Sequence, residues 1–258
     1  MTSFAARPSE DGTCLVLVDY DNAFPPNRDM SDGEIAVEVA RWLQELAARH
    51  PQLGAFEVRL YGGWYDDNDL SRHGSNVARV LASMPDFPMI LSNRRVVRGA
   101  ITLAVNPIGS ASSTPLYGTY RRRGSLPRIR PRQPHPDACV QPDATCPAAI
   151  LRSFTKHSRR ECPVNTCSIV SSEAFEVHEQ KMVDTLLSTD ILVAGRRQSG
   201  YAMVVVVSGD SDFLPPLLVA SVDGGVTLVQ LVPRAEEASD YASAILSGVG
   251  VEIMGMSS

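Results

Sequence analysis

The chain has no long apolar run and no basic stretch followed by an apolar segment near its start. The apolar run Met203–Val207 is far shorter than the about 20 residues that a membrane-spanning helix needs. Met1–Thr13 is polar and contains Glu10 and Asp11, which is not the pattern of a signal peptide. We therefore expect a soluble, cytoplasmic protein.

Cysteine is scarce, with five residues in a chain of 258, and the five do not have the spacing of a disulfide framework. A chain of this length can bury a full core without such cross-links, as one large domain or as a domain with an insertion. We expect reduced thiols, with Cys14 in the core. The sequence also has no glycine-rich phosphate-binding loop of the nucleotide type.

Acidic residues are nearly absent from one part of the chain, although the net charge of the whole is −5. Between Arg94 and Arg160 there are twelve arginines and one lysine but only two aspartates, a balance of +11 that leaves −16 for the rest. A basic segment on an acidic body can attract a polyanion, so we expect it to bind nucleic acid. A solvated, arginine-rich loop is the alternative.

Short apolar runs alternate with helical patterns at the start of the chain. Continuous apolar runs of this length are typical of strands buried on both faces. The predicted elements are strands at Cys14–Val18, Phe56–Tyr61 and Met89–Leu91, a helix from Gly33 that Ser31 or Asp32 caps and Pro51 ends, and a helix over Ser75–Met84. This alternation predicts parallel strands joined by right-handed crossovers.

The alternation stops over residues 93–172, which contain nine of the eighteen prolines and four of the five cysteines. We interpret this stretch as an Arg-rich insertion into a single domain that spans residues 13–255. Within it, Ile101–Val105 and Leu116–Tyr120 are predicted to pair as a hairpin.

Regular patterns return at Glu173. The predicted elements are a helix over Glu173–Val193 with Val177, Met182, Leu186 and Leu187 inward, a strand at Met203–Val207, a helix over Phe213–Val222, a strand at Val226–Leu231, a helix over Glu236–Leu246 and an edge strand at Val251–Met254. The whole pattern predicts an α/β, Rossmann-like fold, in which a parallel sheet is flanked by helices.

Aspartates follow two of the predicted strands and lie on the helix before one of them. These residues are Asp19 and Asp21, Asp210 and Asp212, and Asp184 and Asp190. Open α/β sheets build their sites beyond the carboxyl ends of strands. Carboxylates that converge there repel each other unless a cation neutralises them, and oxygen ligands suit Mg²⁺ or Mn²⁺. Helix capping by each pair is the alternative.

Three segments, in this order, resemble the NYN domain, a branch of the PIN-like ribonucleases with a Rossmann-like fold. They are Leu17–Asn22 (LVDYDN), Glu179–Asp184 (EQKMVD) continuing to Asp190–Leu192, and Val206–Leu214 (VVSGDSDFL). The resemblance covers about residues 13–92 and 173–255. The long basic, cysteine-containing insertion departs from the compact family core.

The resemblance implies a set of ligands for Mg²⁺ or Mn²⁺, namely Asp19, Asp184, Asp210 and Asp212. It implies that Asn22 and Ser208 position water or a neighbouring carboxylate by hydrogen bonds and that Asp190 is a supporting acid. It also implies that Lys181 meets a phosphate. Asp21 stands where many members of the family have a neutral residue.

The insertion holds a possible zinc site, formed by Cys139, Cys146, Cys162 and Cys167, with His135 and His157 nearby. Thiolates in two pairs suit tetrahedral Zn²⁺, which would order a polar segment. The gaps of six and four residues are wider than is usual in such sites, and unrelated free thiols are the alternative.

A run of three arginines, Arg121, Arg122 and Arg123, stands beside Tyr117 and Tyr120 in a stretch without acidic residues. Guanidinium groups can bind phosphates and tyrosines can stack on bases, so we expect these arginines to bind RNA. The alternative is that they pair with the acidic body of the protein.

These observations favour a metal-dependent ribonuclease, endonucleolytic on single-stranded RNA. A PIN-like module that binds RNA or protein without cutting is the second hypothesis. The third is a phosphatase of the haloacid dehalogenase type, because Asp19-Tyr20-Asp21 imitates its nucleophile motif, although Ala23 departs from it. His50, His73 and His178 have no partner at catalytic spacing and are interpreted as surface or cap residues, and Trp64 as a core residue.

Overall fold

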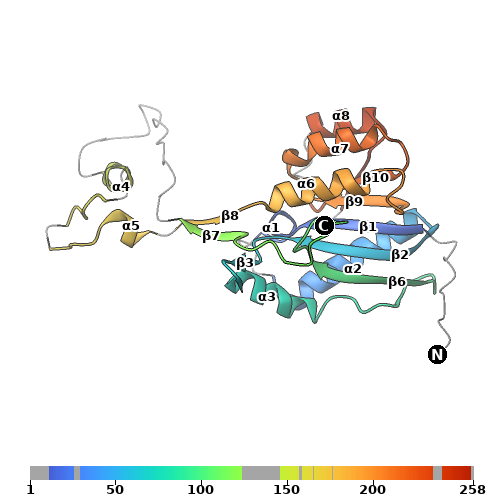
Figure 1. The fold of residues 1–258 in the computed structure, drawn as a ribbon, viewed down its shortest axis with the longest axis horizontal. Coiled ribbons are helices and arrows are strands. Elements are labelled where there is room, and N and C mark those ends of the chain that lie inside the picture. Colours follow the sequence, from blue (N-terminus) through green and yellow to red (C-terminus); the bar gives the residue numbers. More distant parts are fainter. Residues whose placement is uncertain are drawn as a thin grey trace. The chain divides into compact units, whose positions relative to one another are not determined.

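The computed structural model describes residues 12–25, 30–123, 146–156, 159–164, 166–175, 177–234 and 240–256, with the backbone alone for 121–123 and 177–179. The chain divides into two compact units (Figure 1). Unit 1 consists of Met1–Thr119 and Lys181–Ser258, and unit 2 of Tyr120–Gln180.

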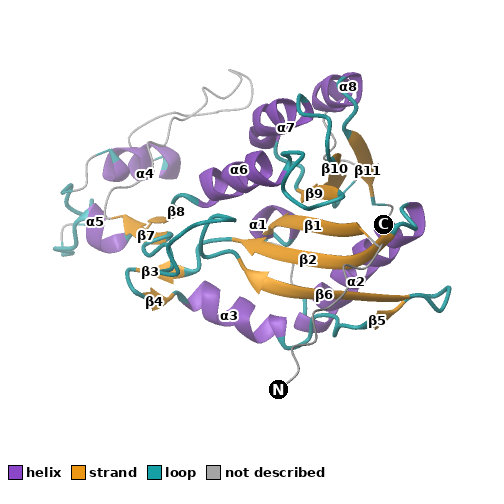
Figure 2. Cartoon of the chain, turned by 45° about the vertical axis from the view of Figure 1, so that its right-hand side comes forward, coloured by secondary structure: helices purple, strands orange, loops and turns teal. Residues whose placement is uncertain are grey.

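Unit 1 is built on a seven-stranded sheet with the strand order β11-β10-β9-β1-β2-β6-β5 (Figure 2). The strands are β1 (Gly12–Asp19), β2 (Leu53–Tyr61), β5 (Met89–Ile90), β6 (Val96–Leu103), β9 (Met203–Val207), β10 (Thr227–Val232) and β11 (Glu252–Gly255). Neighbouring strands are parallel except β5 and β6. This confirms the predicted α/β class with a mostly parallel sheet.

Helices flank the sheet on both faces, as predicted. They are α1 (Tyr20–Ala23), α2 (Asp32–Arg49), α3 (Arg72–Leu81), α6 (Val183–Ala194), α7 (Leu214–Ser221) and α8 (Asp240–Gly248), with a short 3-10 helix η1 (Ser211–Phe213) before α7. A small antiparallel strand pair, β3 (Tyr65–Asp66) and β4 (Asp69–Leu70), lies between β2 and α3 in the sequence. No helix in the described ranges is long and apolar enough to cross a membrane.

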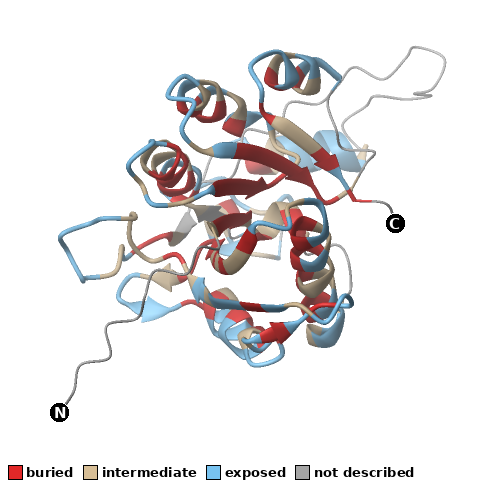
Figure 3. Ribbon diagram, turned by 90° about the vertical axis from the view of Figure 1, so that its right-hand side faces the viewer, coloured by how far each residue is buried: buried red, intermediate tan, exposed pale blue. Residues whose placement is uncertain are grey.

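The apolar run in β1 is buried on both sides, which is why it is continuous rather than alternating. Cys14, Val16 and Val18 pack with residues of α2 and α3, whereas Leu15 and Leu17 pack with residues of α6, α7 and α8. The sheet thus separates two cores, and the buried residues concentrate in its strands and on the helix sides that face them (Figure 3).

The start of α2 confirms the predicted cap. The Ser31 side chain accepts a hydrogen bond from the Glu34 N–H, and the Glu34 carboxylate accepts one from the Ser31 N–H. Each bond satisfies a donor that the first turn of a helix leaves without a partner. The helix ends at Arg49, just before Pro51.

The predicted hairpin at 101–105 and 116–120 is wrong, because the first of these segments belongs to the main sheet. β6 pairs in parallel with β2, from Arg98 opposite Ala55 to Leu103 opposite Leu60. The completely buried Val97 and the partly buried Ile101 draw the strand into the core that α2 and α3 cover. Residues 93–119 therefore lie in unit 1 rather than in a separate insertion.

Met89–Leu91 was predicted to continue the parallel sheet, but β5 is an antiparallel edge strand on β6. A tight return between Ile90 and Val96 leaves no room for a crossover, which parallel pairing requires. The Arg95 side chain connects this return to the start of β2 by donating hydrogen bonds to the carbonyl groups of Pro51 and Leu53.

The predicted helix over Glu173–Val193 is also wrong in its first half. It divides into α5 (Ser171–Ala174), β8 (Val177–Gln180) and α6, and Met182 has a positive φ of 64° directly before α6. The Lys181 N–H donates to the Thr119 C=O, so this N–H does not form a helical hydrogen bond. Met182 is 41% exposed, against the prediction, whereas Leu186 and Leu187 are buried as predicted.

Unit 2 is small and contains little core. β7 (Tyr120–Arg123) pairs with β8 in antiparallel fashion, and α4 (Pro147–Thr155) and α5 complete its described elements. Phe154 and Phe175 make an edge contact with ring centres 5.7 Å apart. Among its described residues, only Thr155 and Ser171 are buried.

Candidate functional site

The predicted acidic residues come together mainly through two neighbouring strands. β1 pairs in parallel with β9, and Val18 lies opposite Val207 at the carboxyl end of both strands. Asp19 is the last residue of β1, and the turn Ser208–Asp212 follows β9. Asp184 stands in the first turn of α6, the helix that packs on β1, β2 and β9.

Hydrogen bonds fix the two strand ends to one another. The Ser208 hydroxyl donates to Asp19 Oδ2 (3.0 Å) and accepts from the Asp210 N–H (3.0 Å). Asn22 Oδ1 accepts from the Gly209 N–H at 2.8 Å, and Asp210 Oδ1 accepts from the Asp212 N–H at 3.0 Å. The Ser208 hydroxyl therefore orients the Asp19 carboxylate, whereas the Asn22 side chain holds the backbone of the turn after β9. Their positioning of water remains a prediction.

Burial and mutual repulsion disfavour the ionised forms of two carboxylates at this edge. Burial raises the pKa of Asp19 to about 7, with further increases from the charges of Asp184 and Asp21, while the Ser208 hydrogen bond lowers it. Burial also raises the pKa of Asp184, and repulsion from Asp210 and Asp212 adds to this. A group of acids that repel each other in this way favours either protons or a cation.

The donor chemistry of this edge suits a hard divalent cation, because the four predicted ligands all offer carboxylate oxygens. As they lie, however, no three acidic, histidine or cysteine side chains in the described ranges form a group that could hold a metal ion. Asp184 and Asp212 are exposed, so their side chains have room to reorient. The Mg²⁺ or Mn²⁺ site remains a prediction.

Asp190 does not join the other carboxylates. It is fully buried; Tyr61 O–H donates to its Oδ2, Ile108 N–H donates to its Oδ1 at 2.7 Å, and Arg59 Nη2 lies 3.3 Å from Oδ2. Asp190 follows Asp184 by six positions, which puts the two side chains on different sides of a helix with 3.6 residues per turn. Its place in the structure is that of a buried anchor between α6, β2 and the loop after β6, not of a supporting acid in the site.

Asp21 and Lys181 lie at the margin of the site. Asp21 Oδ1 is 3.1 Å from Nε2 of His73, a residue that was predicted to have no partner at catalytic spacing. No signal in the sequence connects these two residues, because 51 residues separate them and only the packing of α3 brings them together. Lys181 directly precedes the turn that leads into α6, and its side chain is half-buried.

Two further residues that sequence reasoning missed support the same edge. Gln230 is 5% exposed and donates from Nε2 to the Ser208 carbonyl at 3.1 Å. Arg234 donates from Nη2 to the Asn22 carbonyl at 2.8 Å. Gln230 carries a signal that could have been used, since it is a polar residue within the otherwise apolar run Leu228–Val232.

The predicted zinc site is not formed by the cysteines that the structure describes. Cys146, Cys162 and Cys167 are free and partly exposed, and no metal-binding group exists among the described residues. Cys139, His135 and His157 lie outside the described residues. Cys14 is core as predicted, and burial raises the pKa of its thiol.

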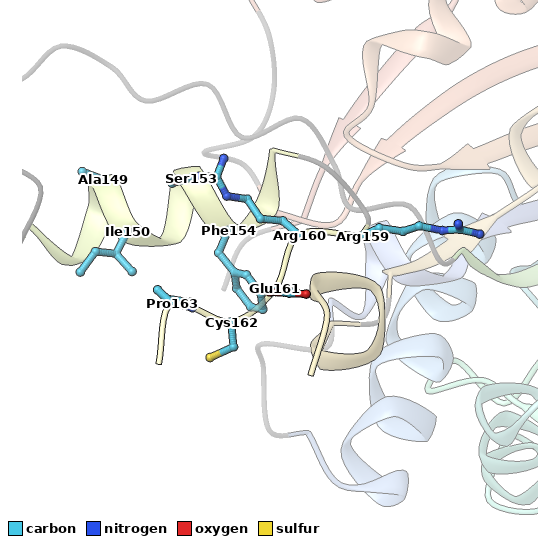
Figure 4. A pocket seen from close by; sticks show the side chains of 9 residues that line it. All are labelled: Ala149, Ile150, Ser153, Phe154, Arg159, Arg160, Glu161, Cys162 and Pro163. Carbon is cyan, nitrogen blue, oxygen red and sulfur yellow. The ribbon is translucent and has the colours of Figure 1, made fainter. Parts of the chain in front are cut away.

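Residues of α4 and of the segment 159–163 line a pocket in unit 2 (Figure 4). It has a volume of about 730 Å³, and Ile150 and Phe154 of α4 line it together with Arg160 and Cys162. None of the predicted catalytic aspartates contributes to it.

Comparisons with protein families, with curated proteins and with solved structures found no match to this chain. The arrangement of its own residues is thus the basis for assigning a function.

Replacing Asp190 with Ala should destabilise the protein strongly, by about 3–5 kcal/mol, because Arg59 and Tyr61 would keep buried polar groups without their partner. Asp184→Ala, on the same helix but exposed, should change the free energy of unfolding by less than about 1 kcal/mol or raise it. Urea unfolding of the two variants measures this difference. Equal losses would show that Asp190 is not the anchor described here.

The pKa of Asp19 predicts a dependence of stability on pH. Because the folded-state pKa is raised from 3.8 to about 7, protonated Asp19 stabilises the fold at low pH, and this contribution is lost as the pH rises from about 4 through 7. In EDTA, Asp19→Asn should therefore be more stable than the wild type at pH 8, by up to about 4 kcal/mol, and no more stable at pH 4. Urea unfolding at pH 4, 6 and 8 tests this, and parallel curves for both proteins would contradict it.

Proposed function

We propose that this protein is a metal-dependent ribonuclease that hydrolyses phosphodiester bonds within single-stranded RNA in the cytoplasm. The observation that carries the proposal is a set of aspartates at the carboxyl edge of the sheet, where burial and repulsion disfavour the ionised forms of two of them. There, burial and neighbouring carboxylates raise the pKa values of Asp19 and Asp184, and hydrogen bonds within the turn after β9 hold Asp210 beside Asp212. Such an arrangement costs stability unless a cation offsets it, which favours a functional reason for it.

In this proposal, Asp19, Asp184, Asp210 and Asp212 would hold Mg²⁺ or Mn²⁺. The ion would polarise a phosphoryl oxygen and lower the pKa of a water molecule when bound. Ser208 keeps the Asp19 carboxylate oriented, because its hydroxyl bonds both to Asp19 and to the Asp210 backbone. Asn22 and Gln230 hold the turn after β9 from two sides, through Gly209 N–H and Ser208 C=O.

RNA is proposed as the substrate for two reasons. The three segments that resemble the NYN domain contain all four proposed ligands, and the basic segment offers charge that complements a phosphate backbone. A module that binds RNA without cutting it is the competing proposal, and only a cleavage assay separates the two.

The direct test is incubation of the purified protein with single-stranded RNA, single- and double-stranded DNA and a phosphomonoester, each with Mg²⁺, Mn²⁺ or EDTA. We expect cleavage of RNA that requires the cation. Binding of RNA without cleavage would support the silent module, and release of phosphate from the monoester would support a phosphatase.

Asp210→Asn should abolish cation-dependent cleavage and leave the fold intact. The substitution removes a ligand charge with almost no change in shape, and the loss of repulsion on Asp184 should keep the melting temperature at or above that of the wild type. Asp223→Asn, at an exposed position after α7, is the matched control and should cleave normally. Full activity in Asp210→Asn would remove this residue from the site.

Changing Arg121, Arg122 and Arg123 together to Ala should weaken RNA binding. Each phosphate contact on a single strand contributes about 0.7 to the slope of log affinity against log salt, so the slope should flatten by up to about two units. Binding titrations at three salt concentrations measure it. A triple variant with wild-type affinity and slope, but lower stability, would mean that these arginines pair with the acidic body instead.

A further inference from the structure

The first turn of α3 is fixed tightly against the loop that leaves the carboxyl end of β2. Ser71 O–H donates to Gly63 C=O, and Ser71 Oγ accepts from the Gly74 N–H, both at 2.8 Å. Gly74 also lies so near to Trp64 that a side chain on it would meet the Trp64 carbonyl at 2.4 Å. His73, which directly precedes Gly74, is therefore held at the same edge of the sheet as Asp19.

The His73 ring is held on three sides. It stacks on Trp64, with ring centres 5.5 Å apart and planes at 11°, and it meets the Tyr20 ring edge-on at 5.8 Å. Nε2 lies at an ion-pair distance of 3.1 Å from Asp21 Oδ1, without the geometry of a hydrogen bond, and is covered from solvent, although the side chain as a whole is 29% exposed. The exposed part of the ring thus lies away from Asp21, and Nδ1 is the nitrogen that remains for another partner.

The pair of His73 and Asp21 adjoins the carboxylate site. Asp21 follows Asp19 by two residues, and its charge contributes to the raised pKa of Asp19. Tyr20 and Asp21 are the titratable groups in contact with the ring, and Asp32 acts on Tyr20 from α2. Burial, with the charges of Asp21 and Asp32, raises the pKa of Tyr20 to about 12, so Tyr20 stays protonated and does not exchange protons with substrate at neutral pH.

An edge of carboxylates has donors for a cation but lacks a group suited to give a proton to a leaving alkoxide near neutral pH. Histidine is the side chain suited to this task, and a carboxylate beside one ring nitrogen orients the ring. Of the two histidines whose side chains the structure describes, His50 pairs with Glu252 at the amino edge of the sheet, so His73 alone stands near the site.

We propose that His73 is the general acid of the phosphodiesterase reaction and that Asp21 is its positioning residue; this inference rests on the proposed function. The oxygen of the attacking water forms a bond to phosphorus while the bond from phosphorus to the leaving oxygen breaks. His73 gives its Nδ1 proton to the leaving oxygen, the water releases a proton to solvent, and His73 regains a proton from solvent. Asp21 takes no part in the transfer of protons and only positions the ring.

The test compares RNA with an activated phosphodiester whose leaving group is 4-nitrophenolate, which departs without needing a proton. His73→Gln should cleave RNA about 100-fold more slowly or worse, yet cleave the activated ester within about 10-fold of the wild type. Asp21→Asn keeps the ring stacking and should show the same pattern with a smaller loss. His50→Gln is the matched control and should behave as the wild type with both substrates.

A second measurement does not depend on cleavage. In EDTA, uridine 3′-monophosphate should shift the ring signals of His73 in NMR spectra, should leave those of His50 unmoved, and should shift His73 less in Asp21→Asn. Melting temperatures show whether each variant folds. If His73→Gln does not fold, Asp21→Asn provides the test.

Several outcomes would overturn the role of His73. These are an unchanged rate of RNA cleavage in His73→Gln, an equal loss of rate on both substrates, or NMR signals of the His73 ring that do not shift when the nucleotide is added. If Asp210→Asn loses cleavage while His73→Gln retains it, only the assignment of His73 fails. If the wild type cleaves neither substrate with Mg²⁺ or Mn²⁺, the proposed function and the general acid fail together.

Discussion

The parallel pairing of β1 with β9 places the two halves of the site next to each other. Both strands are buried on both faces, and their last pair, Val18 and Val207, sets the register. The chain therefore leaves both strands at the same edge, and Ser208 reaches Asp19 across 189 positions of sequence. A shift of one residue in this register would turn Asp19 to the other face of the sheet, so the apolar fit of the strands also fixes the position of the carboxylate.

Three aspartates of one neighbourhood differ because their surroundings differ. Asp190 is fully buried, but a tyrosine, a backbone N–H and an arginine compensate its charge, so it anchors the fold. Asp19 is partly buried, and burial raises its pKa to about 7 although hydrogen bonds from the Ser208 hydroxyl and the Asn22 backbone lower it. Asp184 is exposed and feels the charges of Asp210 and Asp212. Burial also raises the pKa of Asp190, so the enclosure of its carboxylate by these three partners, and not its pKa, distinguishes it from Asp19 and Asp184.

The aromatic residues beside the site give this edge its rigidity. Tyr20 packs against Phe24 and Trp64, and Phe24 stacks on Trp42 of α2. This group continues to His73, so the short helix after β1 and the first turn of α3 form one packed surface. Burial at this packed edge is the main cause of the raised pKa of Asp19.

Local signals in the sequence were enough for the α/β class, for β1 and β9, for the cap of α2 and for the aspartates that end the strands, since burial on two faces and capping each leave a pattern within a few residues. They failed at β6, at the break before α6 and at Asp190. Parallel pairing with β2, a positive φ at Met182 and the contact with Arg59 all involve partners or conformations that no local pattern records. The pairing of His73 with Asp21 arose in the same way, because long-range packing alone joins two residues from separate elements.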